Sequence, residues 1–146
     1  MGDQVTRLEL PAEISSLRRF RDFVRCGAKA AAFGERELGQ LELVVEEILV
    51  NVARYAYPEG KPGNIEVGYA VEGGNTLFVQ VSDTGRPFDP LTNDPPDLRR
   101  SLAERPVGGL GIFLVRQFAH TVEYRRIENR NILSFRLVNT AKFSHD

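Results

Sequence analysis

The sequence predicts an α+β fold, a two-layer α/β sandwich in which helices cover one face of a mixed, mostly antiparallel sheet. Strand-like runs come in pairs joined by short turns, which is the pattern of hairpins and therefore of antiparallel sheet. Helical patterns cluster between these pairs, so the helices must pack together on one face of the sheet. The chain of 146 residues has the length of a single domain.

The first half of the chain contains one predicted strand and two predicted helices. Alternating apolar and polar residues predict a short strand over 5–10, which Pro11 ends. Apolar residues at helical spacing, beginning with Ile14, predict a helix over 13–33. A continuous apolar stripe and an acidic first turn predict a longer helix over 35–57.

The second half contains two predicted hairpins, separated by a loop and a helix. The hairpin strands are expected over 64–71, 76–82, 121–126 and 131–138. The turn at 72–75 holds two glycines and an asparagine, which suit positive backbone angles, and the second turn is expected at 128–130. The proline-rich segment 83–107 predicts a long loop of the kind that forms lids or binding segments, and a helix follows over 108–119.

Composition excludes several classes of protein. The 19 Lys and Arg residues against 20 Asp and Glu give a net charge of −1, so we expect no direct nucleic-acid binding through a strong basic field. Cys26 stands alone, which excludes an internal disulfide and a cysteine-rich metal site, and it is expected to be at least half-buried. Residues 1–7 are too polar for a signal peptide, and no apolar run reaches the roughly 18 residues of a membrane helix. We therefore expect a cytoplasmic protein that does not bind membranes.

Glu47 and Asn51 lie one turn apart at the edge of the apolar stripe of the long helix. A carboxylate and a carboxamide at this spacing could position a hydrated divalent cation, because Mg²⁺ takes oxygen ligands and keeps several waters. The alternative is that both are ordinary boundary residues of an amphipathic helix.

Two further motifs contain glycine. Asp83 stands at a predicted strand end, where its carboxylate can accept a hydrogen bond from an exocyclic amine, and Gly85 would let the backbone approach a flat ligand. The alternative is a plain Asp-x-Gly turn. The glycines of 108–111 open a helix and would leave backbone N–H groups for a phosphate, although a flexible hinge fits the same pattern.

The order of these motifs resembles the GHKL ATPase superfamily, and within it the small anti-sigma-factor serine kinases. The resemblance covers nearly the whole chain and implies a single ATP-binding domain over 1–146 with the histidine-kinase-like, or Bergerat, fold. It implies ATP and Mg²⁺ as cofactors and an ATP lid over 89–108. By this resemblance Glu47 is the general base and Asn51 the Mg²⁺ ligand.

The remaining site residues also follow from the resemblance. Asp83, with Gly85 beside it, would bind the adenine amino group, and Arg105 would reach the terminal phosphate. The phosphates would be held by Gly109, Leu110, Gly111 and Ile112.

Two positions depart from the pattern. Pro87 replaces the second glycine of the first glycine motif, and Tyr55 stands where many relatives have a histidine.

The function implied by the resemblance is that of an ATP-dependent serine/threonine protein kinase and anti-sigma factor. Such a protein sequesters a sigma factor, phosphorylates an anti-anti-sigma antagonist and forms a homodimer. An ATP-binding regulatory module without phosphotransfer remains an alternative. The catalytic domain of a sensor histidine kinase fits less well, because His120 and His145 both lie downstream of the expected metal site, and a topoisomerase or chaperone fragment fits less well still.

Overall fold

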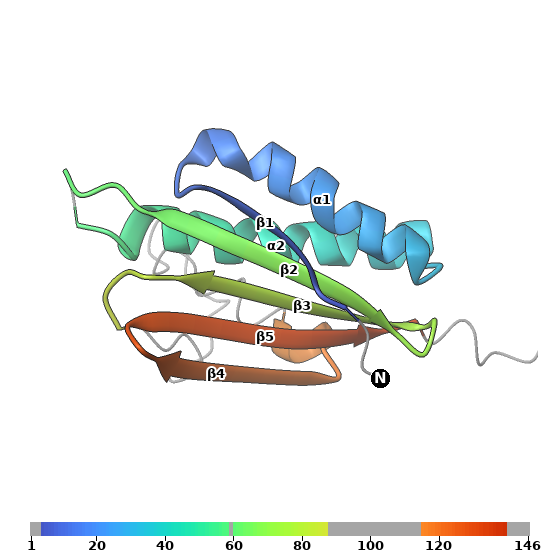
Figure 1. The fold of residues 1–146 in the computed structure, drawn as a ribbon. Coiled ribbons are helices and arrows are strands. Elements are labelled where there is room, and N and C mark those ends of the chain that lie inside the picture. Colours follow the sequence, from blue (N-terminus) through green and yellow to red (C-terminus); the bar gives the residue numbers. More distant parts are fainter. Residues whose placement is uncertain (1–3, 59, 88–114, 140–146) are drawn as a thin grey trace, which may run out of the picture.

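The computed structural model describes residues 4–58, 60–87 and 115–139, which form an α+β sandwich. The elements in chain order are β1 (Thr6–Pro11), the 3-10 turn η1 (Ile14–Ser16), α1 (Leu17–Ala30), α2 (Glu35–Tyr55), β2 (Asn64–Glu72), β3 (Thr76–Asp83), β4 (Thr121–Ile127) and β5 (Arg130–Val138). The two long helices lie side by side against one face of the sheet (Figure 1). The predicted fold class is confirmed.

The five strands form one sheet in the order β1-β2-β3-β5-β4. Each pair of neighbours is antiparallel, so the described part of the sheet is wholly antiparallel rather than mixed. Strand β3 is the middle strand and β5 lies beside it, and their register places Asp83 opposite Asn131. This pairing brings Asp83, the first residue of a predicted motif, next to a strand far along the chain.

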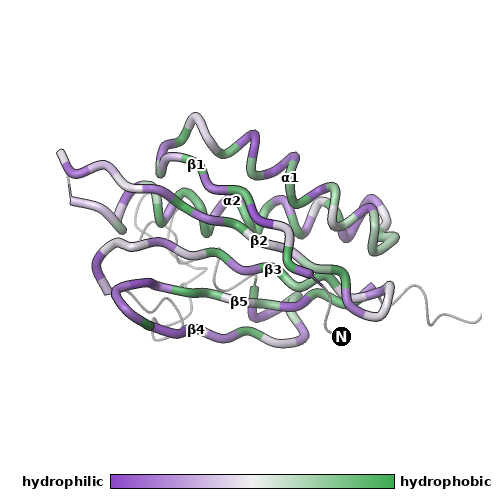
Figure 2. Tube along the Cα trace, viewed as in Figure 1, coloured by the Kyte–Doolittle hydropathy of each residue, from purple (hydrophilic) through white to green (hydrophobic). Residues whose placement is uncertain are grey.

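The core lies between the sheet and the two helices. Successive strand residues point to opposite faces, so burial alternates along β3 and β5, and Figure 2 shows hydrophobic and hydrophilic residues mixed along each strand. The largest fully buried side chains come from both layers and include Phe20, Leu41, Leu49, Ile65, Leu77 and Phe135. Each contributes roughly 1.5–3 kcal/mol by leaving water, so this contact between layers holds α2 firmly over the sheet.

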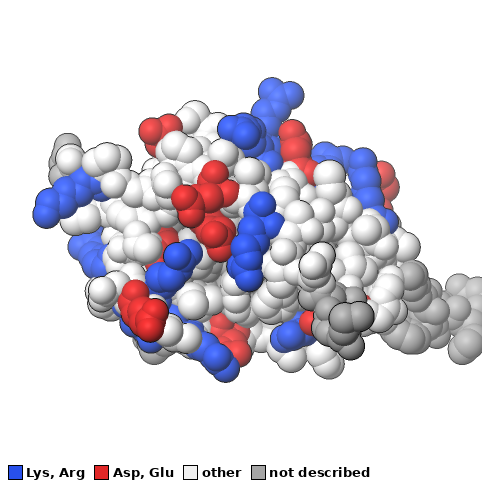
Figure 3. Space-filling model, viewed as in Figure 1, with Lys and Arg blue, Asp and Glu red and all other residues white. Residues whose placement is uncertain are grey.

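The other face of the sheet carries charged side chains of both signs (Figure 3). Arg7 on β1 pairs with Glu66 on β2 at 3.2 Å. Arg136 on β5 pairs with Glu72 at 2.8 Å, and this hydrogen bond raises the pKa of Arg136. These ion pairs link strands across the outward face, which also carries Phe78, with the Arg136 guanidinium 4.8 Å from the centre of its ring.

Helix α2 carries two of the predicted site residues, and its sequence explains where it begins. Glu35 and Glu37 place negative charge in the first turn, at the positive end of the helix dipole. The carboxylate of Glu37 also accepts the Gly34 N–H at 3.4 Å. The buried face of α2 consists of Leu38, Leu41, Val44, Val45, Ile48 and Leu49.

The predicted start of the first helix was wrong. Glu13 has extended backbone angles, and the chain makes a 3-10 turn before α1 begins at Leu17. The reason is tertiary, because Ala12 N–H still bonds to the Gly63 carbonyl and keeps the chain beside the sheet. Ile14, which the helical pattern counted as apolar core, is therefore 54% exposed.

Of three local predictions, one turn is confirmed, the other turn is shorter than predicted, and the burial of Cys26 is wrong. Gly73 and Gly74 have φ of +61° and +75°, which confirms the tight turn between β2 and β3. The second turn is shorter than predicted, because only residues 128 and 129 have positive φ and Arg130 already belongs to β5. Cys26 was expected to be at least half-buried but is exposed, since it lies on the outer side of α1.

Of the predicted helix over 108–119, only residues 115–118 fall within the described helical part of the chain. Among the described residues, no helix has an apolar stretch long enough to cross a membrane.

Candidate functional site

A cavity of about 40 Å³ lies between the C-terminal half of α2 and the sheet. Its walls are mostly apolar, and its lining residues are Ile48, Asn51, Val52, Tyr55, Ala56, Val81, Asp83, Tyr124, Asn131 and Leu133. Apolar walls with a few convergent polar groups are typical of small-molecule sites. The cavity is thus the candidate site of the described residues.

Two predicted site residues from separate motifs meet in this cavity. Asn51 comes from α2 and Asp83 from the end of β3, and both line the same space. Glu47 is half-buried one turn before Asn51 on the same side of α2, although it is not among the lining residues. The structure therefore brings Asn51 and Asp83 together, with Glu47 next along the helix.

Asp83 is buried, with 6% of the residue exposed, and its carboxylate is held at one oxygen. Its Oδ1 accepts the Gly85 N–H at 2.8 Å and an Asn131 Nδ2 hydrogen at 2.9 Å. Within the described residues, no donor bonds to Oδ2. Asp83 can thus offer one oxygen to a ligand while the other fixes its orientation.

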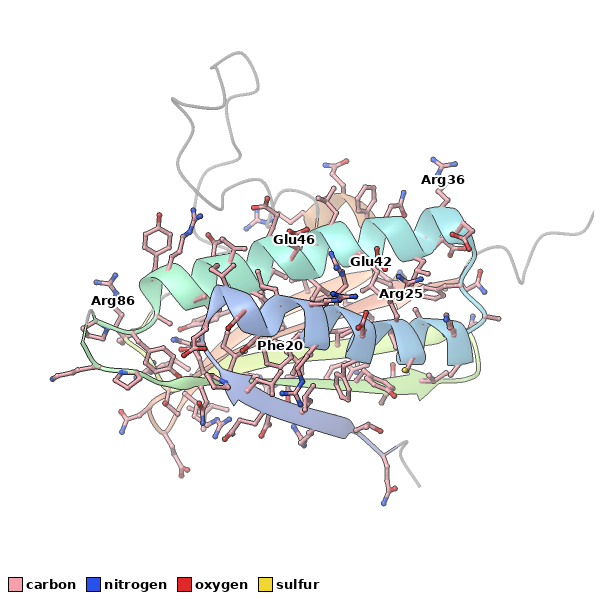
Figure 4. All side chains as sticks on the ribbon, turned by 90° about the horizontal axis from the view of Figure 1, so that it is seen from above. Phe20, Arg25, Arg36, Glu42, Glu46 and Arg86 are labelled. Atoms are coloured by element: carbon pink, nitrogen blue, oxygen red, sulfur yellow. The ribbon has the colours of Figure 1, made fainter. Side chains whose placement is uncertain are left out.

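The segment after Asp83 is attached to the end of α2. Arg86 donates its backbone N–H to the Ala56 carbonyl at 2.9 Å and its Nε–H to the Tyr55 carbonyl at 2.7 Å. These bonds satisfy carbonyls that a helix end leaves without an intrahelical partner. They also explain why α2 ends at Tyr55 rather than at residue 57 as predicted. Figure 4 shows Arg86 beside this end of the helix.

Gly85 has a steric role in this contact. A Cβ placed on it would lie 2.1 Å from the Ala56 carbonyl oxygen, so no other residue fits without a backbone shift. The sequence predicted that Gly85 allows a ligand to approach closely. The close approach that the structure shows is that of α2.

Three further residues hold the segment, and none of them belongs to a predicted motif. Arg126 on β4 donates to the Gly85 carbonyl at 2.8 Å, and Asn131 donates to the Arg86 carbonyl at 2.8 Å. Tyr57 accepts the Thr84 N–H at 2.9 Å through its hydroxyl, which donates to the Asn64 carbonyl. The residues that were missed are Tyr57, Arg126 and Asn131. One signal was present, since Asn131 is a polar residue at an inward position of an otherwise apolar strand face.

The two positions that depart from the family pattern, Tyr55 and Pro87, both lie within the part of the chain that the structure describes. Tyr55 lines the cavity and is 39% exposed, so it forms part of the wall. Pro87 is exposed at the end of the described segment. The predicted lid over 89–108 lies outside the described residues, as do Arg105, Gly109, Leu110, Gly111 and Ile112.

A family model for the histidine kinase-like ATPase domain matches residues 10–137 of this sequence. The chain belongs to this family. The match includes the whole of α2, the end of β3 and the cavity between them, so the predicted superfamily and its fold are confirmed.

Curated relatives lie among serine kinases. The chain is 28% identical over 143 residues to the serine-protein kinase RsbW of Listeria monocytogenes, a match that covers 95% of this chain and 90% of that protein. It is 31% identical over 94 residues to the serine/threonine-protein kinase BtrW of Bordetella bronchiseptica, covering 64% of this chain and 66% of that protein. The predicted resemblance to the small serine kinases of the superfamily is confirmed.

Solved structures show the same fold. The RsbU and RsbW domains of a Mycobacterium tuberculosis protein match with a TM-score of 0.64 at 13% identity, covering 92% of this chain and 32% of that chain. A blue-light activated histidine kinase of Erythrobacter litoralis matches with a TM-score of 0.58 at 20% identity, covering 77% of this chain and 34% of that chain. The chain thus spans about a third of each solved chain.

The polar groups of the cavity fit two parts of a magnesium nucleotide, the base and the metal ion. Asp83 Oδ2 offers an acceptor between apolar walls, as the amino group of a flat purine requires. The Asn51 amide supplies the kind of oxygen that ligates Mg²⁺, which is usually bound by one or two protein oxygens together with phosphates and waters.

Proposed function

We propose that this chain is an ATP-dependent serine/threonine protein kinase that also acts as an anti-sigma factor. It would sequester a sigma factor and phosphorylate a serine or threonine of a small anti-anti-sigma antagonist. The family membership and the named serine-kinase relatives support the activity. The observation that carries it is the convergence of Asn51 and Asp83 on one cavity.

In this proposal the cavity binds the nucleotide from two sides. Asp83 Oδ2 accepts the amino group of adenine, and the apolar walls exclude water from the faces of the ring. Asn51 holds Mg²⁺ through its amide oxygen. The backbone from Gly109 to Ile112 is proposed to donate to the phosphates at a helix start. When bound, magnesium ATP would supply the phosphoryl group, and its Mg²⁺ ion would supply positive charge that offsets the negative charge of the phosphates.

Glu47 is proposed to accept or orient the proton of the acceptor hydroxyl. Its place one turn before Asn51 puts a carboxylate beside the metal ligand on the same helix side. Arg105 is proposed to reach the terminal phosphate. Phosphoryl transfer depends mainly on positioning and charge stabilisation, so these two groups would act by geometry more than by covalent chemistry.

The proposed partners follow from the same resemblance. We expect a homodimer in the cytoplasm that contacts a sigma factor and a protein antagonist, and that contacts neither nucleic acid nor membrane directly. The charges of this chain are balanced, which agrees with a protein partner rather than a nucleic acid.

The base assignment is tested by Glu47→Gln with Glu46→Gln as a matched control. Glu46 neighbours Glu47 on α2 but is exposed, on the outer side of the helix (Figure 4). Labelled ATP, Mg²⁺ and the cognate antagonist are incubated with each variant, and ATP binding is measured by calorimetry. We expect Glu47→Gln to bind ATP and to lose phosphotransfer by roughly 10²–10⁴-fold, the range of a general base. Turnover by Glu47→Gln at the rate of Glu46→Gln would reject the assignment.

The regulatory alternative gives a different result in the same assay. A module that uses ATP only to set a partner-binding conformation would bind the nucleotide and leave the antagonist unlabelled. Labelling of the antagonist by the wild-type chain would support the kinase and contradict the regulatory alternative.

A further inference from the structure

We propose that Asn131 and Tyr124 are positioning residues that make the cavity select a purine with an amino group at C6 over one with an oxo group. Both side chains line the cavity beside Asp83 and reach it through a chain of hydrogen bonds. The inference rests on the proposed function, because it takes ATP as the ligand. It assigns a role to two residues that no sequence motif singled out.

The groups around Asn131 determine which end of its side-chain amide is the NH₂ group and which is the oxygen. One end of the amide faces two acceptors, Asp83 Oδ1 at 2.9 Å and the Arg86 carbonyl at 2.8 Å. A carbonyl carries no proton, so this end must be the NH₂ group. The other end, Oδ1, accepts the hydroxyl proton of Tyr124 at 2.6 Å. A flipped amide would lose all three bonds.

The fixed amide in turn fixes the carboxylate of Asp83. Two donors, from Asn131 and from the Gly85 backbone, meet at Oδ1 and oppose rotation of the carboxylate. The oxygen left for a ligand is Oδ2, which presents lone pairs. An amino group at C6 donates to these lone pairs, whereas an oxo group places its own lone pairs against them. A site built around a hydrogen bond rejects the analogue that cannot make it.

Burial makes this arrangement effective. Asn131 and Asp83 are each 6% exposed, so water cannot readily replace a lost donor. The sheet itself sets the spacing, since Asn131 pairs with Asp83 across β3 and with Arg126 across β4. The chain from Tyr124 to Asp83 is therefore built on strands, which hold a site more rigidly than loops do.

The test compares the binding of ATP and inosine triphosphate, which differ at the C6 position, by calorimetry. We expect the wild-type chain to prefer ATP. Asn131→Ala should lower the ratio of the two affinities by roughly tenfold, because it removes a bond to a charged group. Tyr124→Phe keeps the ring and removes only the hydroxyl, so it should lower the ratio by less, roughly threefold. If Asn131→Ala does not fold, the affinity ratio of Tyr124→Phe alone tests the positioning role.

Asn139→Ala is the matched control. Asn139 is buried just beyond the other end of β5, where its amide donates to the carbonyls of Ala31 and Ala32. Its loss should weaken folding and leave the ratio unchanged. If Asn131→Ala and Tyr124→Phe both keep the wild-type ratio, the positioning role is wrong while the ATP site stands. If the wild-type chain binds neither nucleotide, the proposed function fails and this inference fails with it.

Discussion

At the scale of single residues, Gly85 shows how a motif position can be required by packing. The end of β3 runs so close to α2 that a methyl group at this position would overlap the Ala56 carbonyl. The same segment receives hydrogen bonds from Arg126 and Asn131 on its other side. It has no room to move away from the helix, so a larger residue must distort the site.

We therefore expect Gly85→Ala to lower the free energy of unfolding by about 3 kcal/mol, the upper part of the usual range for overpacking. Urea denaturation measures this change. Gly39→Ala is the control, because Gly39 lies exposed on α2 and its added Cβ would meet nothing within 4 Å. That variant should gain roughly 0.5–1 kcal/mol, the usual benefit of alanine over glycine in a helix. Equal stability of Gly85→Ala and the wild-type chain would contradict the steric account.

At the scale of elements, Asn139 connects three parts of the fold. Its amide donates to Ala31 and Ala32 at the end of α1, at 3.1 and 2.8 Å, and its N–H bonds to the Asn75 carbonyl in the β2–β3 turn. Ala32 has a φ of +59°, which ends the helix. The buried amide thus holds the end of α1 against the sheet.

Truncating this amide should destabilise the chain by about 1–3 kcal/mol, since buried carbonyls lose their donor. Asn139→Ala and Asn139→Asp are compared by urea denaturation. Aspartate keeps the shape but, when ionised, donates nothing, so it should be no better than alanine. Wild-type stability of Asn139→Asp would show that shape rather than hydrogen bonding holds the helix end.

The elements also show what sequence can and cannot predict here. Helix α2 and both hairpins follow from local spacing, because the apolar stripe and the turn residues act within a few positions of the chain. The late start of α1 does not, since it depends on the contact between Ala12 and Gly63. Asn51 and Asp83 were found through motifs. Asn131 was missed, because its role arises only when β5 pairs with β3.

At the scale of the whole molecule, apolar packing holds α1 and α2 in place more than charge does. Arg25 and Glu42 face each other between the helices at 3.0 Å (Figure 4). Their side chains are 40% and 26% exposed, so the pair contributes at most about 1 kcal/mol. The buried apolar side chains therefore dominate the position of α2, and with it the position of Asn51 over the sheet.

A ligand that binds only the folded chain must raise the stability of the whole molecule. Magnesium ATP at 100 times its dissociation constant should add about 2.7 kcal/mol to the free energy of unfolding. Asp83→Asn presents an amide in place of the carboxylate, and it should lose most of this gain at the same ATP concentration. Thermal denaturation with and without ATP measures both. An equal gain in Asp83→Asn would place the nucleotide elsewhere on the molecule.

The measurement that tests the central claim most directly is calorimetry of ATP with and without Mg²⁺, for the wild-type chain and for Asn51→Ala. The account predicts that Mg²⁺ strengthens ATP binding by the wild-type chain. It predicts that this dependence on Mg²⁺ disappears in Asn51→Ala, while weak binding of the base remains. Absence of ATP binding by the wild-type chain, or an unchanged Mg²⁺ dependence in the variant, would contradict the account.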